Sequence, residues 1–397
     1  MSIELNEKQM QGLQIAVERY NHNERYTVIA GYAGTGKSTL VRFIIDALRV
    51  PEEDIVYCAY TGKATQVLQK KGNKNTSTLH KLLWDSYPTK DGGFRRVPKL
   101  SIDYKIVVID ECSMVPKEMV DMLARHRECH FLFLGDPGQL PPIDKDADNH
   151  LLDTPHIFLD EIMRQESESE IISLSMKIRN GEDIPLMKGK DVQVISKDEL
   201  NTGMLMWADQ ILVATNATRV AINNQMRQLL GRGEKPEDGD KVICLRNYWS
   251  AIGEEESALI NGTIGTIHNP YESFISIPSF KTLDGNPKKV DTLVADFVSD
   301  TNESFGTFCM DKKLILEGEP ALNKRETFNL SSRKPYMEPP MEFTYGYAIT
   351  GHKSQGSEWD KVLIIEEKFP FAKDEHKRWL YTCVTRSASK VVLVKAN

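Results

Sequence analysis

The chain has 397 residues, of which 27% are charged and 40% hydrophobic, as in soluble globular proteins of about two or three domains. Its formal net charge of −7 argues against nonspecific coating of DNA, although one groove of an acidic protein can still be basic. No run approaches the roughly 18 apolar residues of a membrane span, and the N-terminus has no secretory signal. The cysteines include no C-x-x-C pair, so we expect a cytoplasmic protein without a zinc site or a disulfide framework.

The first part of the chain alternates between helical and strand-like segments. Apolar residues at helical spacing between 10 and 20 predict an amphipathic helix. Short apolar runs predict strands at 26–30, 55–60, 105–109 and 130–134. Strands that alternate with helices predict a parallel sheet with both faces covered.

A second series of strand-like runs follows later in the chain, at 210–215, 240–245, 263–267, 361–367 and 390–395. Two stretches interrupt the alternation. The first, 85–103, is rich in turn residues and locally basic, and the second, 270–340, carries many prolines and short alternating segments. The second stretch predicts a small β-rich insertion rather than further α/β structure.

The stretch "GYAGTGKST" (31–39), called the P-loop below, fits the pattern G-x-x-x-x-G-K-[ST] between a predicted strand and a predicted helix. Its glycines let backbone amides turn toward phosphate oxygens, and the helix N-terminus adds its positive dipole. Lys37 is expected to reach the β and γ phosphates of a nucleotide, and Ser38 to place its hydroxyl on Mg²⁺. A chance glycine turn is the alternative. The predicted nucleotide-binding set here is Gly34, Thr35, Gly36, Lys37, Ser38 and Thr39.

Polar residues also follow two other predicted strands. "IVVIDE" (106–111) delivers Asp110 and Glu111 to the sheet edge at which ligands bind in open α/β proteins. Asp110 is expected to hold Mg²⁺, and Glu111 to orient and deprotonate water; a solvated strand end is the simpler alternative. In "FLGDPGQLPP" (133–142), Gln139 can donate and accept hydrogen bonds, which suits a γ-phosphate or water sensor. A Pro-Gly turn leaving the sheet is the alternative there.

Four more residues are candidates for the same site. Asn6 and Gln9 match a helix cap with its third-position partner, and the Gln9 amide is also a candidate to read the adenine edge. Arg164 and Arg386 are candidates to balance phosphate charge from a facing domain, which would couple hydrolysis to domain closure. Lone arginines are usually surface residues, so this interpretation depends on the motifs around them.

Taken together, these stretches resemble the superfamily 1 helicases, most closely the RecD/Dda-like branch (SF1B), over nearly the whole chain. A P-loop alone is shared by many NTPases. The ordered combination of "GDPGQLPP" (135–142), "HKSQGSEWD" (352–360) and "YTCVTRS" (381–387) is highly specific. Further matching stretches are "LNEKQ" (5–9), "AYTGKATQVL" (59–68), "STLHKLL" (77–83), "IMRQ" (162–165), "TNATRVAINNQ" (215–225) and "NGTIGTI" (261–267).

The resemblance implies an α/β fold with two RecA-like parallel-sheet motor domains, with ATP in their cleft and single-stranded DNA across their tops. The first motor domain is expected at 1–84 and 104–155, and the second at 156–269 and 341–397. A hairpin insertion at 85–103 is expected to act as a pin, and a small β-barrel (SH3-like) insertion is expected at 270–340. Phe94 at the hairpin tip could stack on the last base pair of a fork; a surface hairpin with one exposed Phe is the alternative.

The resemblance also implies roles for single residues. The set expected to contact DNA is Thr61, Lys63, His80, Phe94, Asn216, Thr350, His352 and Lys353. Thr350, His352 and Lys353 lie in the polar stretch 350–360. From the same stretch, Gln355, Gly356 and Glu358 are expected to face the nucleotide, with Glu358 suiting a ribose hydroxyl. Departures from the usual pattern are Tyr32 and Tyr60 in place of proline, Gly351 in place of an apolar residue, and Ser387 in place of alanine. None of them removes a group with an expected chemical role.

The sequence therefore predicts an ATP- and Mg²⁺-dependent DNA helicase that moves 5′ to 3′ on single-stranded DNA and unwinds forked duplex. We expect a monomer in a bacterial or phage-infected cell, acting in DNA replication, recombination or repair beside single-strand-binding or replication proteins, with no membrane partner. Two alternatives stay open. One is a motor that displaces proteins from DNA or remodels RNA, and the other is a nucleotide-gated binding module with little turnover.

Overall fold

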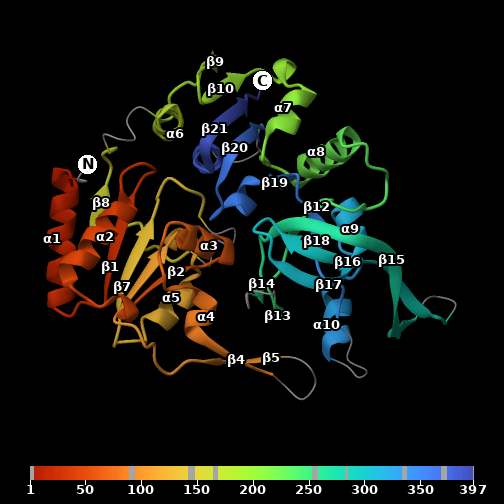
Figure 1. The fold of residues 1–397 in the computed structure, drawn as a ribbon, viewed down its shortest axis with the longest axis horizontal. Helices are drawn as coiled ribbons and strands as arrows, with labels where there is room; N and C mark the ends of the chain where they lie inside the picture. Colours follow the sequence, from red (N-terminus) through yellow and green to blue (C-terminus); the bar gives the residue numbers. More distant parts are fainter. Residues whose placement is uncertain are drawn as a thin grey trace. The chain divides into compact units, whose positions relative to one another are not determined.

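The computed structural model describes residues 4–88, 94–141, 148–163, 169–252, 258–281, 285–332, 338–367 and 373–396. The chain divides into two compact units (Figure 1). The larger unit comprises 1–212 and 351–397, and the smaller unit comprises 213–350. None of the helices within the described ranges combines the length and hydrophobicity that a membrane crossing needs.

The N-terminal half of the larger unit is built on a parallel sheet of six strands. Apolar side chains alternate between its two faces, and β7 is buried along its whole length, as expected of a sheet covered on both sides. The predicted parallel α/β sheet is therefore confirmed. In the order in which they pair, its strands are β3 (Thr76–Thr78), β2 (Ile55–Ala59), β6 (Ile106–Asp110), β7 (His130–Gly135), β1 (Tyr26–Gly31) and β8 (Ile157–Leu159).

Helices cover both faces of this sheet. On one face, α1 (Glu7–Asn21) and α2 (Lys37–Leu48) bury Ala16, Leu40 and Ile44 against the strands. On the other face lie α4 (Leu79–Leu83) and α5 (Lys117–Leu123), whose leucines join a second apolar cluster. Helix α3 (Gly62–Lys70) packs Ala64 and Leu68 beside the end of β2. Short 3₁₀ helices are η1 (Glu52–Asp54), η2 (Cys112–Met114), η4 (Lys197–Glu199) and η5 (Gly351–Ser354).

The C-terminal half of the larger unit contains a second sheet with parallel strands. Its pairs are parallel except at β9, which runs antiparallel to β10. Within this unit the order is β11 (Gln210–Val213), β20 (Trp359–Ile365), β21 (Ser387–Val394), β10 (Val192–Ile195) and β9 (Met187–Lys188). Its helices are α6 (Glu170–Asn180), α7 (Thr202–Trp207) and α11 (Lys373–Val384), and α6 packs against α11. The expectation of two parallel sheets is thus confirmed.

A short hairpin begins one residue before the predicted 85–103 insertion and ends within it. Strand β4 (Trp84–Pro88) pairs antiparallel with β5 (Phe94–Pro98), from Trp84 opposite Pro98 to Pro88 opposite Phe94. The connecting residues 89–93 and the side chain of Phe94 lie outside the described part of the structure. The role of Phe94 at the tip of a pin stays a prediction.

The smaller unit is built on an antiparallel sheet, which confirms the predicted β-rich insertion in its coarse form. Phe297, Phe343 and Tyr345 are buried at its centre. The sheet also includes residues outside 270–340, and two helices follow its last long strand; the SH3-like barrel stays a prediction. Its strands, in pairing order, are β17 (Ser304–Asp311), β16 (Pro287–Ser299), β15 (Ile264–Lys281), β12 (Lys241–Cys244) and β18 (Phe343–Tyr345). The other elements are α8 (Asn216–Leu229), β13 (Tyr248–Ile252), β14 (Ala258–Leu259), α9 (Lys312–Glu317), α10 (Lys324–Ser332) and β19 (Ala348–Thr350).

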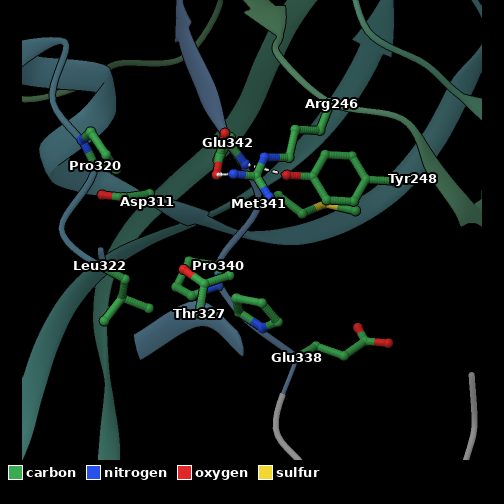
Figure 2. Close-up of a pocket in the computed structure, with 11 residues that line it drawn as sticks. Arg246, Tyr248, Asp311, Pro320, Leu322, Thr327, Glu338, Pro340, Met341 and Glu342 are labelled. Atoms are coloured by element: carbon green, nitrogen blue, oxygen red, sulfur yellow. Dashed lines mark hydrogen bonds and ion pairs between the residues drawn. The ribbon is translucent and has the colours of Figure 1, made fainter. Parts of the chain in front are cut away.

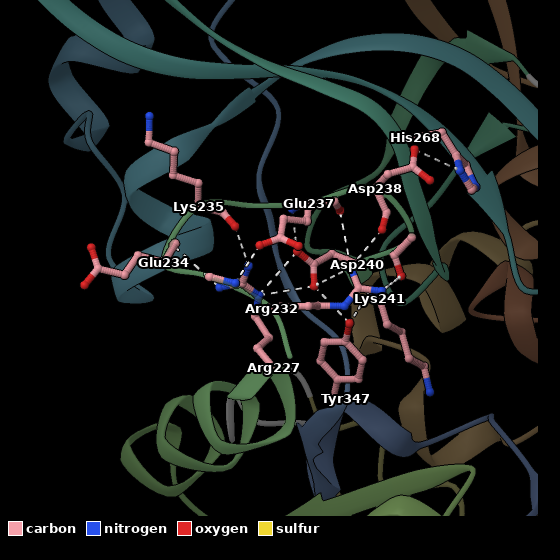
Figure 3. Close-up of polar contacts among 12 residues, drawn as sticks. Arg227, Arg232, Glu234, Lys235, Glu237, Asp238, Asp240, Lys241, His268 and Tyr347 are labelled. Atoms are coloured by element: carbon pink, nitrogen blue, oxygen red, sulfur yellow. Dashed lines mark hydrogen bonds and ion pairs between the residues drawn. The ribbon is translucent and has the colours of Figure 1, made fainter. Parts of the chain in front are cut away.

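A buried carboxylate ties α8 to this sheet (Figure 3). Asp240 is fully buried and lies 3.2 Å from Arg227 Nε and 3.2 Å from Arg232 Nη1. It also accepts hydrogen bonds from the Glu237 N–H (2.7 Å) and the Tyr347 hydroxyl (2.9 Å). Four donors on one carboxylate offset its loss of water, and they hold the segment between α8 and β12 in place.

We expect Asp240→Ala to lower the free energy of unfolding of the smaller unit by about 3–5 kcal/mol, because it leaves the buried Arg227 guanidinium without its charge partner. Urea unfolding measures this change. Asp238→Ala is the matched control, because its carboxylate is 65% exposed and lies only two residues away. Equal unfolding midpoints for the two variants would contradict the importance of the buried pair.

Candidate nucleotide site

The P-loop has the backbone conformation that phosphate binding requires. Gly34 and Gly36 adopt φ values of 74° and 78°, in the left-handed region that favours glycine. A Cβ at Gly36 would collide with Met163 Sδ and with Gln9 Nε2. Because Gly36 directly precedes α2, the free N–H groups of the first helical turn adjoin the loop, and they suit a phosphate.

The lysine of the P-loop folds back on the loop itself. Lys37 Nζ donates hydrogen bonds to the carbonyl oxygens of Gly31 (2.7 Å) and Tyr32 (3.0 Å). The ring of Tyr32 is covered by Arg179, whose guanidinium carbon lies 3.7 Å from the ring centroid. Tyr32 thus contacts α6 through its ring and Lys37 through its carbonyl.

Two carboxylates stand at the end of β6. Asp110 Oδ1 accepts a hydrogen bond of 2.8 Å from the Glu111 N–H. Burial raises the pKa of Asp110, as does the charge of Glu111, while Lys71 and Lys37 oppose the shift. Glu111 has a φ of 50°, a sparsely populated conformation for a residue with a side chain. The strand end thus holds a partly buried carboxylate, followed by a residue whose backbone is strained.

The donor set at Asp110 fits Mg²⁺. Ser38 and Asp110 line one pocket and offer a hydroxyl and a carboxylate. Among the described residues, no group of three or more His, Cys, Asp or Glu side chains could hold a metal alone. Mg²⁺ usually keeps several waters and binds through one or two carboxylates together with substrate phosphates, so these two ligands would suffice.

Three predicted catalytic residues contact one another. Arg386 Nη1 lies 3.6 Å from Glu111 Oε1. With its amide oriented to satisfy both neighbours, Gln139 donates to Glu111 Oε2 (3.0 Å) and accepts from Arg386 Nη2 (3.0 Å). Arg386 also donates to the carbonyls of Thr382 (3.2 Å) and Ser357 (3.3 Å). Both carboxylate oxygens of Glu111 are therefore engaged.

One pocket of the larger unit gathers most of the predicted site. It lies where α2, α3 and the ends of β6 and β7 meet the loops before β20 and β21. The predicted residues that line it are Gly34, Lys37, Ser38, Asp110, Glu111, Gln139, Gly356, Glu358 and Arg386. Arg164 lies outside the described residues, so its role stays a prediction.

The remaining nucleotide candidates lie outside the lining of this pocket. Asn6 and Gln9 form the expected capping box of α1, and Gln9 Nε2 also donates to the Thr35 carbonyl (3.2 Å). Gln355 Nε2 donates to the Leu140 carbonyl (2.7 Å). Thr39 lines a neighbouring cavity behind α2. The ligand roles of these residues stay predictions.

The predicted DNA contacts are divided between the two units. Thr61 caps α3 through a bond from the Ala64 N–H (3.2 Å) and lies beside Gly356, while the Lys63 ammonium lies 5.3 Å from the Trp359 ring centroid. The other residues of this set that the larger unit holds are His80 at α4, Phe94 at the start of β5, and His352 and Lys353 in η5. The residues in the smaller unit are Asn216 at the start of α8 and Thr350 at the end of β19.

The aromatic surroundings of His80 set it apart from the other predicted DNA contacts. Its ring centroid lies 5.6 Å from that of Tyr60 and 5.5 Å from that of Trp84. Burial lowers the pKa of the other histidine of the set, His352, and this favours the neutral imidazole. Neither side chain therefore resembles a freely solvated surface histidine.

Sequence reasoning missed two residues near the pocket. Lys71 lines it from the end of α3, and its charge lowers the pKa of the Asp110 carboxyl. Tyr381 is buried and hydrogen bonds to Asp136. Tyr381 and Asp136 both lie in stretches that resemble the family, 381–387 and 135–142, and this resemblance could have drawn attention to them. Lys71 follows the matching stretch 59–68 by three residues.

A second cavity lies in the smaller unit, and no predicted site residue lines it (Figure 2). Apolar side chains such as Leu322 and Met341 form much of its wall. Arg246 Nη2 lies 2.6 Å from Glu342 Oε1, and the Glu342 N–H donates to the Tyr248 hydroxyl (2.5 Å). The polar groups of Arg246, Tyr248 and Glu342 are thus paired within the protein.

Comparisons with known proteins agree with the motifs. Residues 4–197 match the family model of an AAA domain, and 345–394 match that of a UvrD-like helicase C-terminal domain. An uncharacterised protein of Acanthamoeba polyphaga mimivirus is 26% identical over 97% of this chain and 99% of its own length. The ATP-dependent RecD2 DNA helicase of Deinococcus radiodurans is 27% identical over 92% of this chain, which spans only 46% of that helicase.

A solved structure shares the fold. The Pif1 helicase from Bacteroides, in complex with ADP-AlF3 and ssDNA, superposes with a TM-score of 0.50 at 18% identity, over 99% of this chain and 92% of that one. The first family match contains the P-loop, and the second contains the "YTCVTRS" stretch. Residues of both stretches line the pocket. This chain belongs to the superfamily 1 helicases, in the RecD/Dda-like branch.

Proposed function

We propose that this protein is an ATP-dependent DNA helicase that translocates on single-stranded DNA. The observation that carries the proposal is the convergence of the P-loop, Asp110, Glu111, Gln139 and Arg386 on one pocket. A lysine at a helix N-terminus, a carboxylate for metal, a carboxylate for water and an arginine are the parts that phosphoryl transfer to water needs.

The contacts within the pocket suggest how hydrolysis is controlled. Lys37 must leave the carbonyls of Gly31 and Tyr32 to reach a β or γ phosphate. Arg386 must likewise leave Glu111 to stabilise the charge that develops on the γ phosphate. Glu111 is then free to accept a proton from the attacking water. Mg²⁺ would be held by Ser38 and Asp110, where it would neutralise phosphate charge.

This exchange of partners would link ATP to movement. Arg386 lies two residues beyond α11, and Gly356 and Glu358 reach the same pocket from the loop that holds His352 and Lys353. Binding of ATP would therefore shift a loop that we propose to contact DNA. The proposed grip uses Thr61, Lys63 and His80 on one side, and Asn216, Thr350, His352 and Lys353 on the other.

The DNA substrate is proposed from the relatives. RecD2 is named an ATP-dependent DNA helicase, and the Bacteroides Pif1 structure contains ssDNA. By the same resemblance we propose 5′-to-3′ movement, a pin at 85–103 with Phe94 near its tip, and an SH3-like accessory domain at 270–340. Replication, recombination or repair is the proposed setting.

Forked substrates with a single-stranded tail at only one end test this function. We expect ATP hydrolysis to rise with single-stranded DNA, and strand separation to require a 5′ tail, because a 5′-to-3′ motor must load there. A gel or fluorescence assay of strand separation, run beside an ATPase assay, measures both. A requirement for a 3′ tail would overturn the proposed polarity.

The same assays separate the alternatives. Hydrolysis stimulated by DNA or RNA without strand separation would favour a motor that displaces proteins or remodels RNA. Hydrolysis that does not respond to nucleic acid would favour the nucleotide-gated binding module. Blunt duplex serves as the control substrate, because it offers no single strand on which to load.

A further inference from the structure

The Tyr381 hydroxyl joins two loops of the nucleotide pocket. It donates a hydrogen bond to Asp136 Oδ2 (2.7 Å) and accepts one from the Ala33 N–H of the P-loop (2.9 Å). The other carboxylate oxygen of Asp136 accepts from the Gly138 N–H (2.8 Å). Tyr381 and Asp136 are only 1% and 2% exposed, so these bonds form away from water.

The loop that begins at Asp136 carries Gln139, which contacts Glu111 and Arg386. On its far side this loop is held at Leu140, whose N–H donates to Thr382 Oγ1 (3.0 Å) and whose carbonyl accepts from Gln355 Nε2 (2.7 Å). Tyr381 and Thr382 are neighbours on α11, so one turn of that helix fixes both ends of the loop. Gln139 lies between these two anchors.

We propose that Tyr381 is a positioning residue for ATP hydrolysis: its hydroxyl holds the Asp136–Leu140 loop against the P-loop, and so places Gln139 beside Glu111. The inference rests on the proposed function, because it requires this pocket to hydrolyse ATP. Tyr381 itself does not line the pocket, and it acts through Asp136 and Ala33. A small displacement of a catalytic group can cost about 10²-fold in rate. Loss of the Tyr381 hydroxyl is therefore expected to slow turnover.

The charges around Asp136 explain why the hydroxyl is needed. Burial raises the pKa of Asp136, whereas the Lys37 charge, the Tyr381 hydroxyl and the Gly138 N–H lower it, and the Glu111 charge raises it further. Burial also raises the pKa of the Tyr381 phenol, so the hydroxyl stays protonated and can donate. Loss of the hydroxyl would leave an Asp136 oxygen and the Ala33 N–H unsatisfied inside the protein.

A purely structural role of Tyr381 would depend on its ring as well as its hydroxyl. The ring packs against Gly138, where an added Cβ would lie 3.0 Å from Tyr381 Cε1. Tyr381→Phe keeps the ring and removes only the two bonds. A matched control is Tyr347→Phe, because the Tyr347 hydroxyl also donates to a buried carboxylate, Asp240 (2.9 Å), and also accepts from a backbone N–H, that of Lys241 (3.2 Å).

Steady-state ATP hydrolysis of wild type, Tyr381→Phe and Tyr347→Phe tests the inference. We expect Tyr381→Phe to lower kcat by about 10²-fold. The KM for ATP and the stoichiometry of a bound fluorescent ADP analogue should be unchanged, because the phosphate-binding groups remain. Tyr347→Phe should keep the wild-type kcat without DNA. Unchanged stoichiometry excludes a loss of folded protein as the cause.

A double-mutant cycle sharpens the test. Because Tyr381 acts through Asp136, the effects of Tyr381→Phe and Asp136→Asn on kcat should be strongly non-additive. Wild-type kcat in Tyr381→Phe, or an equal loss in Tyr347→Phe, would overturn the inference and leave the proposed function standing. Absence of hydrolysis by the wild type would overturn the proposed function, and the inference with it.

Discussion

Lys37→Ala is expected to lower ATP hydrolysis by about 10³-fold, because the variant loses the P-loop cation that stabilises phosphate charge. Lys37 stands in the first turn of α2 and already reaches two carbonyls of the P-loop. Lys71 also lines the pocket, but it lies at the end of α3, beside the carboxylate of Asp110. Lys71 is therefore placed to balance Asp110 rather than to replace Lys37.

A steady-state phosphate-release assay measures the effect of Lys37→Ala. Lys74→Ala is the matched control, because its side chain is 74% exposed and pairs with the exposed Glu52 at 2.7 Å on the same half of the larger unit. The control should keep wild-type turnover. Normal turnover in Lys37→Ala would instead remove the basis for placing the nucleotide at the P-loop.

The parallel sheets could be predicted because their strands are buried on both faces. In the first sheet the predicted strands β1, β2, β6 and β7 are short, largely apolar runs, and β7 is buried at all six positions. The antiparallel sheet was predicted only as a β-rich region. Its strand β15 has 18 residues but changes register at two places, between His268 and Tyr271 and between Ile277 and Lys281, which breaks the alternating pattern.

The centre of the site could also be predicted, and topology explains why. Strands β6, β7 and β1 are parallel neighbours, so the residues that follow them meet at one edge of the sheet. That edge collects Asp110, Gln139 and Lys37. The bond between Tyr381 and Asp136 joins residues 245 positions apart, and no local pattern encodes it. The partner of Gln355 was missed for the same reason.

Glu111→Gln is expected to lower kcat by about 10³-fold while nucleotide binding is retained, because the amide keeps the shape of the side chain but cannot accept a proton from water. The change also removes the negative charge that lies 3.6 Å from Arg386 Nη1. Arg386 then breaks no ion pair with residue 111 when it moves to a phosphate. We therefore expect the KM for ATP to stay the same or fall.

Single-turnover hydrolysis, combined with a measurement of bound ATP, separates the two effects of Glu111→Gln. The variant should accumulate bound ATP, whereas Lys37→Ala should not. Glu118→Gln, on the exposed face of α5, removes the same charge from the same half of the larger unit and should behave as wild type. Wild-type kcat in Glu111→Gln would show that another group activates the water. Loss of both binding and turnover would assign Glu111 to holding the nucleotide rather than to proton transfer.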